Sequence, residues 1–288
     1  MFRTLALAGS LALAFGPSPH QSGRVALEAA DCSHTNMMFG DYEVGRAVQH
    51  GTIPLSAGRL DVQPESNGGV RIERGSGNAY SITACIGAGA RTFAEAQAAA
   101  DAVRLDLQGG RVRVTGAAPN VQNWSIQLIV EAPEPADIYI ETRNGPISLD
   151  DVSGRFEARA QNGPIALSGV RGDVRVRAQN GPIHVQGSQG EFDVETQNGP
   201  ISISLDGTRW DGHLDARSHN GPLNVHVPDD YRSGVEISSS VHSPWSCRMS
   251  ACGSGSRDWN EDSRSLRVGL DPVVVHISTN NGPVSVSR

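Results

Sequence analysis

The stretch AQNGPIALSGVRGDVRVRAQNGPIHV, residues 160–185, contains the same sequence unit twice, 18 residues apart. Its marker is the tripeptide Asn-Gly-Pro, which occurs six times in the chain, at Asn144, Asn162, Asn180, Asn198, Asn220 and Asn281. The first four copies are spaced by 18 residues, the fifth follows after 22 and the sixth after 61. A tripeptide that recurs at a near-constant interval indicates a repeat architecture in which each unit stacks on its neighbour.

Two short apolar alternations lie between successive Asn-Gly-Pro copies. One follows the proline, as in Ile165 and Leu167, and the other leads back to the next asparagine, as in Val174 and Val176. Alternation at every second residue, rich in β-branched side chains, predicts half-buried strands. Each unit is therefore predicted to contribute two strands and two corners, the second corner at a glycine such as Gly172.

The proline decides between two topologies for these strands. Asn-Gly usually marks a two-residue β-hairpin, but proline has no N–H with which to close that turn. A solenoid corner needs no such bond, and it places each asparagine above the previous one, where asparagine ladders stabilise in-register parallel strands. We therefore predict an all-β fold, a parallel β-helix or solenoid with coils of about 18 residues, over residues 58–288. Three further segments are interpreted as degenerate copies of the Asn-Gly-Pro corner: Asn67-Gly68-Gly69, Gln108-Gly109-Gly110 and His242-Ser243-Pro244.

The outward residues of the predicted return strands form columns. One column reads Tyr139, Glu157, Arg175, Asp193 and Asp215, and the next reads Glu141, Arg159, Arg177, Glu195 and Arg217. A third, polar row reads Arg143, Gln161, Gln179, Gln197 and His219. Several column neighbours have opposite charges, which supports the register but stabilises it by only about 0.2–1 kcal/mol per exposed pair.

Two segments interrupt the repeat. Thr92-Phe93-Ala94-Glu95 has the form of a capping box and predicts a short capping helix at about residues 92–105, with Phe93, Ala96, Ala100 and Val103 on one face. We expect this helix to cover a sheet face or an open solenoid end, because uncovered strand edges invite aggregation. The second interruption, about residues 246–265, is rich in Ser, Gly, Arg and Asp and is expected to be a loop insertion.

The beginning of the chain and its composition indicate export. Residues 1–23 hold one arginine followed by an apolar run from Leu5 to Phe15, which predicts a signal peptide, and residues 24–57 form an N-terminal extension. No second apolar run is long enough for a membrane span. The net charge of −7 argues against nucleic-acid binding, and all 24 basic side chains are arginine, which excludes lysine chemistry.

Four cysteines, Cys32, Cys85, Cys247 and Cys252, remain after the predicted signal peptide. An even number in an oxidising compartment favours disulfides. Proximity favours Cys247 with Cys252, which leaves Cys32 with Cys85. A four-cysteine zinc site is the weaker alternative, because no Cys-x-x-Cys spacing occurs.

The residues do not converge on a catalytic or metal site. The acidic pairs, such as Asp150 with Asp151, alternate faces or lie in corners, whereas a glycosidase needs two carboxylates facing each other about 5–9.5 Å apart. The outward histidines His184 and His226 have no neighbours that would complete a ligand set. Trp245 and Trp259 flank the predicted loop and are the candidates for ligand contact, with anchoring in the loop or core as the alternative.

Four segments resemble a bacterial domain-of-unknown-function family labelled putative adhesin. They are Thr142-Arg143-Asn144-Gly145-Pro146-Ile147, Arg209-Trp210-Asp211-Gly212, Val227-Pro228-Asp229-Asp230-Tyr231 and Thr279-Asn280-Asn281-Gly282-Pro283-Val284. The resemblance covers roughly residues 55–288, and the family typically has Thr-x-Asn-Gly-Gly where this chain has Asn-Gly-Pro. It implies a β-solenoid at the cell envelope and transfers no catalytic or ligand residues.

These observations favour an exported, non-enzymatic envelope protein that presents a rigid, repetitive surface. The expected location is the periplasm, the outer-membrane surface or the extracellular space. The expected partner is a glycan or an envelope protein, and the solenoid ends would allow two copies to pair. No cofactor and no metal is expected. Two alternatives are a carbohydrate-active β-helix enzyme with its site near residues 246–265 and an accessory protein of envelope-stress signalling.

Overall fold

The computed structural model describes residues 32, 35, 37–64, 67–116, 123–249, 251–254 and 256–288. Residues from Thr35 to Arg288 form one compact unit. The signal peptide predicted for residues 1–23 lies outside the described residues. Where the structure is described, no helix is long and apolar enough to cross a membrane.

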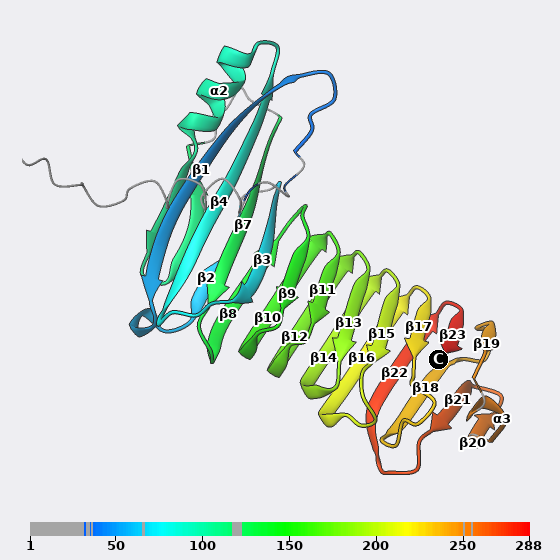
Figure 1. The fold of residues 1–288 in the computed structure, drawn as a ribbon. Helices are drawn as coiled ribbons and strands as arrows, with labels where there is room; N and C mark the ends of the chain where they lie inside the picture. Colours follow the sequence, from blue (N-terminus) through cyan, green and yellow to red (C-terminus); the bar gives the residue numbers. More distant parts are fainter. Residues whose placement is uncertain are drawn as a thin grey trace, which may run out of the picture. The chain divides into compact units, whose positions relative to one another are not determined.

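The described part of the chain forms two sheets (Figure 1). The first sheet, of 11 strands, has the order β1 (Glu43–Pro54), β4 (Ala79–Ala90), β7 (Trp124–Ala132), β3 (Gly68–Arg74), β9 (Ile147–Asp150), β11 (Ile165–Ser168), β13 (Ile183–Gly187), β15 (Ile201–Leu205), β17 (Leu223–His226), β23 (Val284–Ser287) and β19 (Trp245–Cys247). The second, of 12 strands, has the order β20 (Ser256–Trp259), β21 (Ser263–Val268), β18 (Gly234–Ser240), β22 (Val273–Asn281), β16 (Asp211–Asn220), β14 (Gln189–Asn198), β12 (Arg171–Asn180), β10 (Ser153–Asn162), β8 (Ala136–Thr142), β2 (Leu60–Val62), β6 (Arg111–Thr115) and β5 (Arg104–Gln108).

The predicted parallel solenoid is confirmed from β8 to β17 and again in β22 and β23, where each coil gives one strand to each sheet. Arg175 lies opposite Glu157 on one side and Asp193 on the other, in the register that the 18-residue step predicts. The 22-residue step keeps this register, since Asp193 lies opposite Asp215. After the 61-residue step, β22 returns to pair with β16, so that β18 becomes the next strand outward.

The core lies between the two sheets and is built by the inward half of each alternation. Ile165 and Leu167 of β11, and Val174 and Val176 of β12, are almost completely buried. The pattern continues along the coils and forms one hydrophobic cluster. Inward apolar residues at every second position therefore fix both the strands and the face that each strand buries.

Each asparagine of the Asn-Gly-Pro corners belongs to a hydrogen-bonded ladder. The Asn180 Nδ2 donates to Asn162 Oδ1 at 3.0 Å, and the Asn198 Nδ2 donates to Asn180 Oδ1 at 3.0 Å. The ladder continues through Asn220 to Asn281 at one end and through Asn144 to Asn67 at the other. The side-chain amides therefore repeat the register that the backbone sets.

The glycine and the proline of the corner have separate roles. A Cβ atom on Gly181 would overlap the carbonyl oxygen of Gly163 in the neighbouring coil, so only glycine allows the coils to approach this closely. The proline carbonyl accepts from the neighbouring coil: the Ile165 N–H donates to Pro182 O at 2.9 Å. Because proline has no backbone N–H, this position of the corner has no donor that needs a partner.

Two of the three degenerate corner copies form corners of the solenoid, as predicted, and the third does not. Asn67 ends the ladder, and the Pro244 carbonyl accepts the Val284 N–H at 2.8 Å, as the other corner prolines do. In contrast, Gly109 and Gly110 form the turn of an antiparallel hairpin between β5 and β6. Both have positive φ, 58° and 77°, which suits a tight hairpin turn, so the interpretation of this segment as a coil corner is wrong.

The first strands are antiparallel and depart from the coil pattern. β1 begins at Glu43, within the segment assigned to the N-terminal extension, and pairs along its whole length with β4, which pairs antiparallel with β7. The sequence shows no period here, because β1 and β4 lack the corner tripeptide. A short 3₁₀ helix, η1 (Leu55–Ala57), follows β1.

The helix α2 (Phe93–Ala102) lies close to the predicted bounds and packs on the sheet face formed by β1 and β4. Its Ala96 and Ala100 are buried, and Ala96 lies directly on Gly45 of β1, where a Cβ atom would overlap the helix backbone. Phe93 is 60% exposed, so its predicted place on the buried face is wrong; small residues face the sheet because the helix lies so close to it.

The opposite end of the unit is more ordered than its composition indicates. Residues 246–265, expected to be a loop, include α3 (Ala251–Ser254), β20 and the start of β21. β20 and β21 pair antiparallel with each other, and β21 pairs antiparallel with β18. Antiparallel strands thus follow the last parallel coil, while the Cys247–Cys252 disulfide ties β19 to α3.

Candidate functional site

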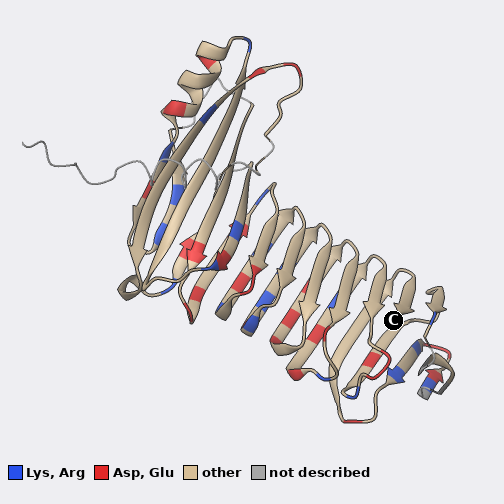
Figure 2. Ribbon diagram, in the orientation of Figure 1, with Lys and Arg blue, Asp and Glu red and all other residues tan. Residues whose placement is uncertain are grey.

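The outer face of the second sheet carries most of the charged side chains of the coils. Figure 2 shows arginines and acidic residues along β10, β12, β14 and β16, whereas the facing strands of the first sheet are nearly free of them. The strands present their outward residues in the predicted columns, since each strand is in register with the next. This face is therefore a grid of polar groups with the spacing of β-strands, about 4.8 Å.

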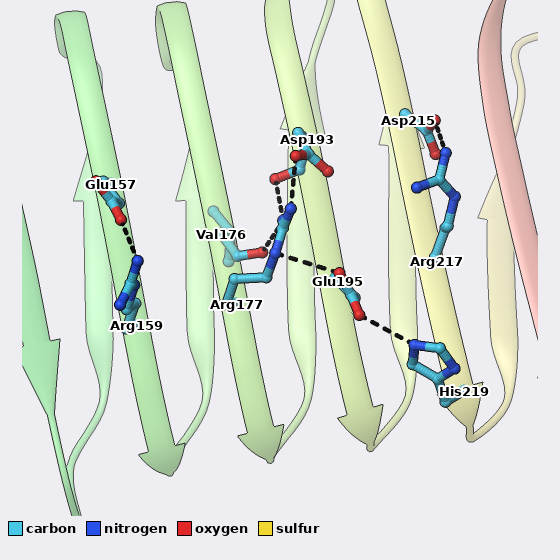
Figure 3. Close-up of polar contacts among 9 residues, drawn as sticks. All are labelled: Glu157, Arg159, Val176, Arg177, Asp193, Glu195, Asp215, Arg217 and His219. Carbon is cyan, nitrogen blue, oxygen red and sulfur yellow. Dashed lines mark hydrogen bonds and ion pairs between the residues drawn. The ribbon is translucent and has the colours of Figure 1, made fainter.

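Most ion pairs on the grid run within a strand or diagonally between strands (Figure 3). Arg159 pairs with Glu157 on the same strand at 2.7 Å, and Arg217 pairs with Asp215 in the same way. Arg177 reaches across to the next strand, to Asp193 at 2.6 Å and to Glu195 at 3.2 Å. The carboxylate of Glu195 also contacts His219 at 3.0 Å.

A hollow of about 760 Å³, here called the groove, lies on this face at the strand ends nearest the Asn-Gly-Pro corners. Its lining comes from β6, β8, β10, β12, β14 and the residues after β2. The lining residues are Gln63, Pro64, Arg113, Glu141, Thr142, Arg143, Arg159, Ala160, Gln161, Arg177, Ala178, Gln179, Glu195 and Gln197. The groove thus crosses the strands and follows the direction in which the coils stack.

One row of the groove has unused hydrogen-bonding capacity. Gln161, Gln179 and Gln197 are exposed near the ends of the adjacent strands β10, β12 and β14, and the exposed Arg143 directly follows β8 in the neighbouring coil. Within the described ranges, their side chains have no hydrogen-bond or ion-pair partner. Arginine offers five donors, and each glutamine amide offers two donors and an acceptor. These groups are therefore available to a ligand.

Two pKa shifts at the rim of the grid follow from its contacts. The Arg59 guanidinium, which donates to Glu157 at 2.8 Å, holds the pKa of that carboxyl below its usual value, and Arg159 adds to the effect. Burial, reinforced by the hydrogen bond to Glu141, raises the pKa of Tyr139 to about 12. Tyr139 therefore stays protonated at neutral pH and donates to Glu141 at 2.6 Å.

The two carboxylates of the groove, Glu141 and Glu195, bond to other side chains and lie far apart. Glu141 is held by Tyr139, and Glu195 by Arg177 and His219. They lie on β8 and β14, three strands apart, which places them about 14 Å from each other. Glycoside hydrolysis requires two carboxyl groups about 5–9.5 Å apart. Among the described residues, no group of three or more His, Cys, Asp or Glu could hold a metal ion.

The two tryptophans selected from the sequence lie outside the groove. Trp245 is half-buried on β19 and donates from Nε1 to Ser239 Oγ at 2.7 Å. Trp259, on β20, is 53% exposed, with the guanidiniums of Arg257 and Arg264 at 5.7 and 5.1 Å from its ring centre. Trp259 is therefore the more exposed of the two, at the edge of the second sheet farthest from β5.

All four cysteines are disulfide-bonded. Cys247 pairs with Cys252, as predicted from their proximity. Cys32 and Cys85 are likewise disulfide-bonded, and no free cysteine occurs among the described residues. The weaker alternative of a four-cysteine zinc site is wrong, because the thiolates that it needs are consumed.

The sequence pattern predicted one row of residues in the groove but not the other residues that line it. The row of Arg143, Gln161, Gln179 and Gln197 was visible as an outward column. Gln63 and Arg113 were missed because the strands that place them, β2 and β6, carry no Asn-Gly-Pro corner. The available signal was the alternation Val112-Arg113-Val114, which marks Arg113 as outward on a half-buried strand.

The sequence matches the model of a family described as Toastrack DUF4097 over residues 96–286. No curated protein matches it. Similar solved structures include a putative cell adhesion protein from Clostridium sporogenes ATCC 15579, with 8% identity, 84% of this chain and 99% of that chain covered, and a TM-score of 0.29. A putative adhesin from Bacteroides fragilis NCTC 9343 has 6% identity, coverage of 84% and 96%, and a TM-score of 0.38. A putative adhesin from Parabacteroides merdae ATCC 43184 has 10% identity, coverage of 88% and 100%, and a TM-score of 0.28.

Proposed function

The chain belongs to the Toastrack DUF4097 family, and from this premise we propose that it is an exported, non-catalytic envelope protein that binds a repetitive partner in the groove. The observation that carries the proposal is the row of Arg143, Gln161, Gln179 and Gln197, four exposed side chains without partners in the described protein. A periodic row suits a partner with its own repeat, such as an envelope glycan or a repetitive envelope protein.

Rigidity supports binding in the groove. The strands that line it are paired on both sides, and the asparagine ladder runs along the corners beside it. A preformed site avoids much of the ordering cost that a mobile surface would incur on binding. The backbone positions that carry these side chains are therefore held at fixed intervals before a partner arrives.

The disulfides support export. Disulfides form and persist in oxidising compartments such as the periplasm and the extracellular space. The Cys247–Cys252 pair and the disulfide-bonded Cys32 and Cys85 fit such a compartment. The signal peptide predicted for residues 1–23 agrees with this proposal.

The charges in the groove support binding more than catalysis. Its carboxylates, Glu141 and Glu195, form ion pairs or hydrogen bonds with other side chains, and their separation across three strands is too large for glycoside hydrolysis. The arrangement can hold a ligand by hydrogen bonds and charge. We therefore favour a binding role over the carbohydrate-active enzyme.

An array of purified envelope glycans and envelope proteins, probed with the purified chain, tests the proposed function. We expect wild type to bind at least one component, Arg143→Glu to lose that binding, and Arg175→Glu to keep it. Arg175 is the matched control, since it lies exposed on the same face outside the groove. Trp259→Ala tests the contact predicted from the sequence and should leave groove binding unchanged. No binding by wild type, or equal binding by both arginine variants, would refute the proposal.

A further inference from the structure

The chemistry of the groove points to one class of ligand. Resting on the proposed binding function, we propose that the groove binds an acidic polysaccharide, a polymer with a carboxylate on its sugar residues, laid across β8, β10, β12 and β14. Three features of the groove carry this inference: its charge, its surplus of hydrogen-bond donors and its regular spacing.

The lining of the groove holds more arginines than carboxylates, and one of these arginines is unpaired in the part of the chain that the structure describes. Its lining contains four arginines and two glutamates, whereas the whole chain carries −7. Arg113 is paired with Asp61 at 2.6 Å, and Arg159 and Arg177 also have carboxylate partners. Arg143 has none within the described protein, so its charge is available to an anion. A guanidinium can bind a carboxylate through two parallel hydrogen bonds.

The groove offers more donors than acceptors. Glu141 and Glu195 already accept from Tyr139, Arg177 and His219. The free groups are the guanidinium of Arg143, the amides of Gln161, Gln179 and Gln197 and one carboxylate oxygen of Glu141, so that N–H donors clearly outnumber the four oxygen acceptors. A ligand rich in oxygen acceptors, with some hydroxyl donors, complements this set. Sugar hydroxyls and carboxylates have this composition.

The spacing of the row favours a regular polymer that crosses the strands. Adjacent strands lie about 4.8 Å apart, so the four side chains of the row span about 14 Å. An extended peptide that adds to a sheet needs an unpaired strand edge, but the strands lining the groove from β6 to β14 are paired on both sides. Proline-rich peptides and single-stranded nucleic acids depend on aromatic side chains, and no described lining residue is aromatic.

Polygalacturonate and its fully methyl-esterified form make a matched pair of probes. The two polymers share a backbone, and esterification replaces each carboxylate by a neutral methyl ester. We expect the purified chain to bind polygalacturonate at least tenfold more tightly than the ester in isothermal titration calorimetry at 0.15 M NaCl. Raising the salt should weaken the binding of polygalacturonate, because exposed charges are then screened.

Two single-charge variants locate the binding. Arg143→Gln extends the glutamine row and removes one charge-assisted contact, so we expect polygalacturonate affinity to fall about tenfold. Arg175→Gln removes the same charge outside the groove, and we expect a change of less than twofold. Gln179→Ala removes neutral hydrogen bonds only and should cost a few-fold. Circular dichroism would establish that each variant remains folded.

The outcomes separate this inference from the proposed function. Preference for the charged polymer together with the Arg143-specific loss supports the inference. Equal binding of polygalacturonate and its ester, or binding only of neutral polymers or proteins through the groove, overturns it and leaves the proposed binding function standing. Preference for the charged polymer with equal losses in Arg143→Gln and Arg175→Gln also overturns it, since attraction would then come from the whole face. Failure to bind any envelope component refutes both.

Discussion

The asparagine ladder allows a prediction about stability whose size follows from counting bonds. Asn180 stands in the middle of the ladder: it donates to Asn162 and accepts from Asn198, both at 3.0 Å. Asn180→Ala therefore removes two hydrogen bonds. Asn281 stands at the end, where its one ladder bond donates to Asn220 at 3.0 Å, so Asn281→Ala removes one.

The expected cost follows from the exposure of the ladder. A hydrogen bond within a protein contributes about 0.5–1.5 kcal/mol net, because water competes for both groups. The ladder asparagines are exposed, so the groups left behind by Asn180→Ala can bond to water, and the lower half of the range applies. We expect Asn180→Ala to lower the free energy of unfolding by about 1–2 kcal/mol and Asn281→Ala by about half as much.

Urea denaturation followed by circular dichroism measures these differences. Asn224→Ala is the control, since Asn224 is an exposed asparagine on β17 with no side-chain hydrogen bond in the described structure, and a change within about 0.5 kcal/mol is expected. The reasoning would be refuted if Asn180→Ala cost no more than Asn224→Ala, or if the middle and end positions cost the same. Stacked repeats can unfold in more than one step. The urea midpoints should therefore be compared only among variants whose unfolding free energy depends on urea concentration with the same slope.

Three further predictions concern the corner, the covered edge and pH. Gly181→Ala should destabilise the chain by about 1–3 kcal/mol, because its Cβ would overlap a neighbouring carbonyl oxygen, whereas Gly187→Ala, where a Cβ meets open space, should change little in the same urea assay. Gln97→Ala removes the amide that accepts from the Arg46 N–H at 3.2 Å and donates to its carbonyl at 2.8 Å, so sedimentation should show more self-association through β1; an unchanged monomer fraction would contradict this. Tyr139, with its pKa raised to about 12, contributes stability that is present below pH 10 and lost between pH 10 and 12, so Tyr139→Phe should show a smaller fall in urea midpoint over that interval than wild type.

The repeat made the coils predictable in detail. The 18-residue period fixes which residues are neighbours, and the alternation fixes which of them point outward. Together they place Arg175 between Glu157 and Asp193, as the structure does. The individual ion pairs were less predictable, because a long arginine side chain has several carboxylates within reach. Arg177, for example, contacts Asp193 diagonally as well as Glu195 in its own column.

Prediction failed where the period is absent. In β1, Gly45 and Gly51 interrupt the apolar alternation, and their role appears only when Ala96 and Leu107 are seen to lie against them. The same close approach explains why Phe93 is exposed, since α2 contacts the sheet through alanines. Tertiary contacts of this kind leave no periodic trace in a single sequence.

The 18-residue step has a consequence for binding as well as for folding. It sets each corner glycine against the next, which brings the coils to strand spacing, and it therefore also sets the spacing of Gln161, Gln179 and Gln197 in the groove. The asparagine ladder and the glutamine row of the groove are neighbours in sequence, since Gln161 precedes Asn162 and Gln179 precedes Asn180. A ligand whose repeat does not match the strand spacing can satisfy one of these amides but not all three. If the groove binds as proposed, selectivity for a polymer over its monomer is expected to follow from the corner that builds the fold, and the unpaired charge of Arg143 at one end of the row is expected to add a preference for an acidic chain.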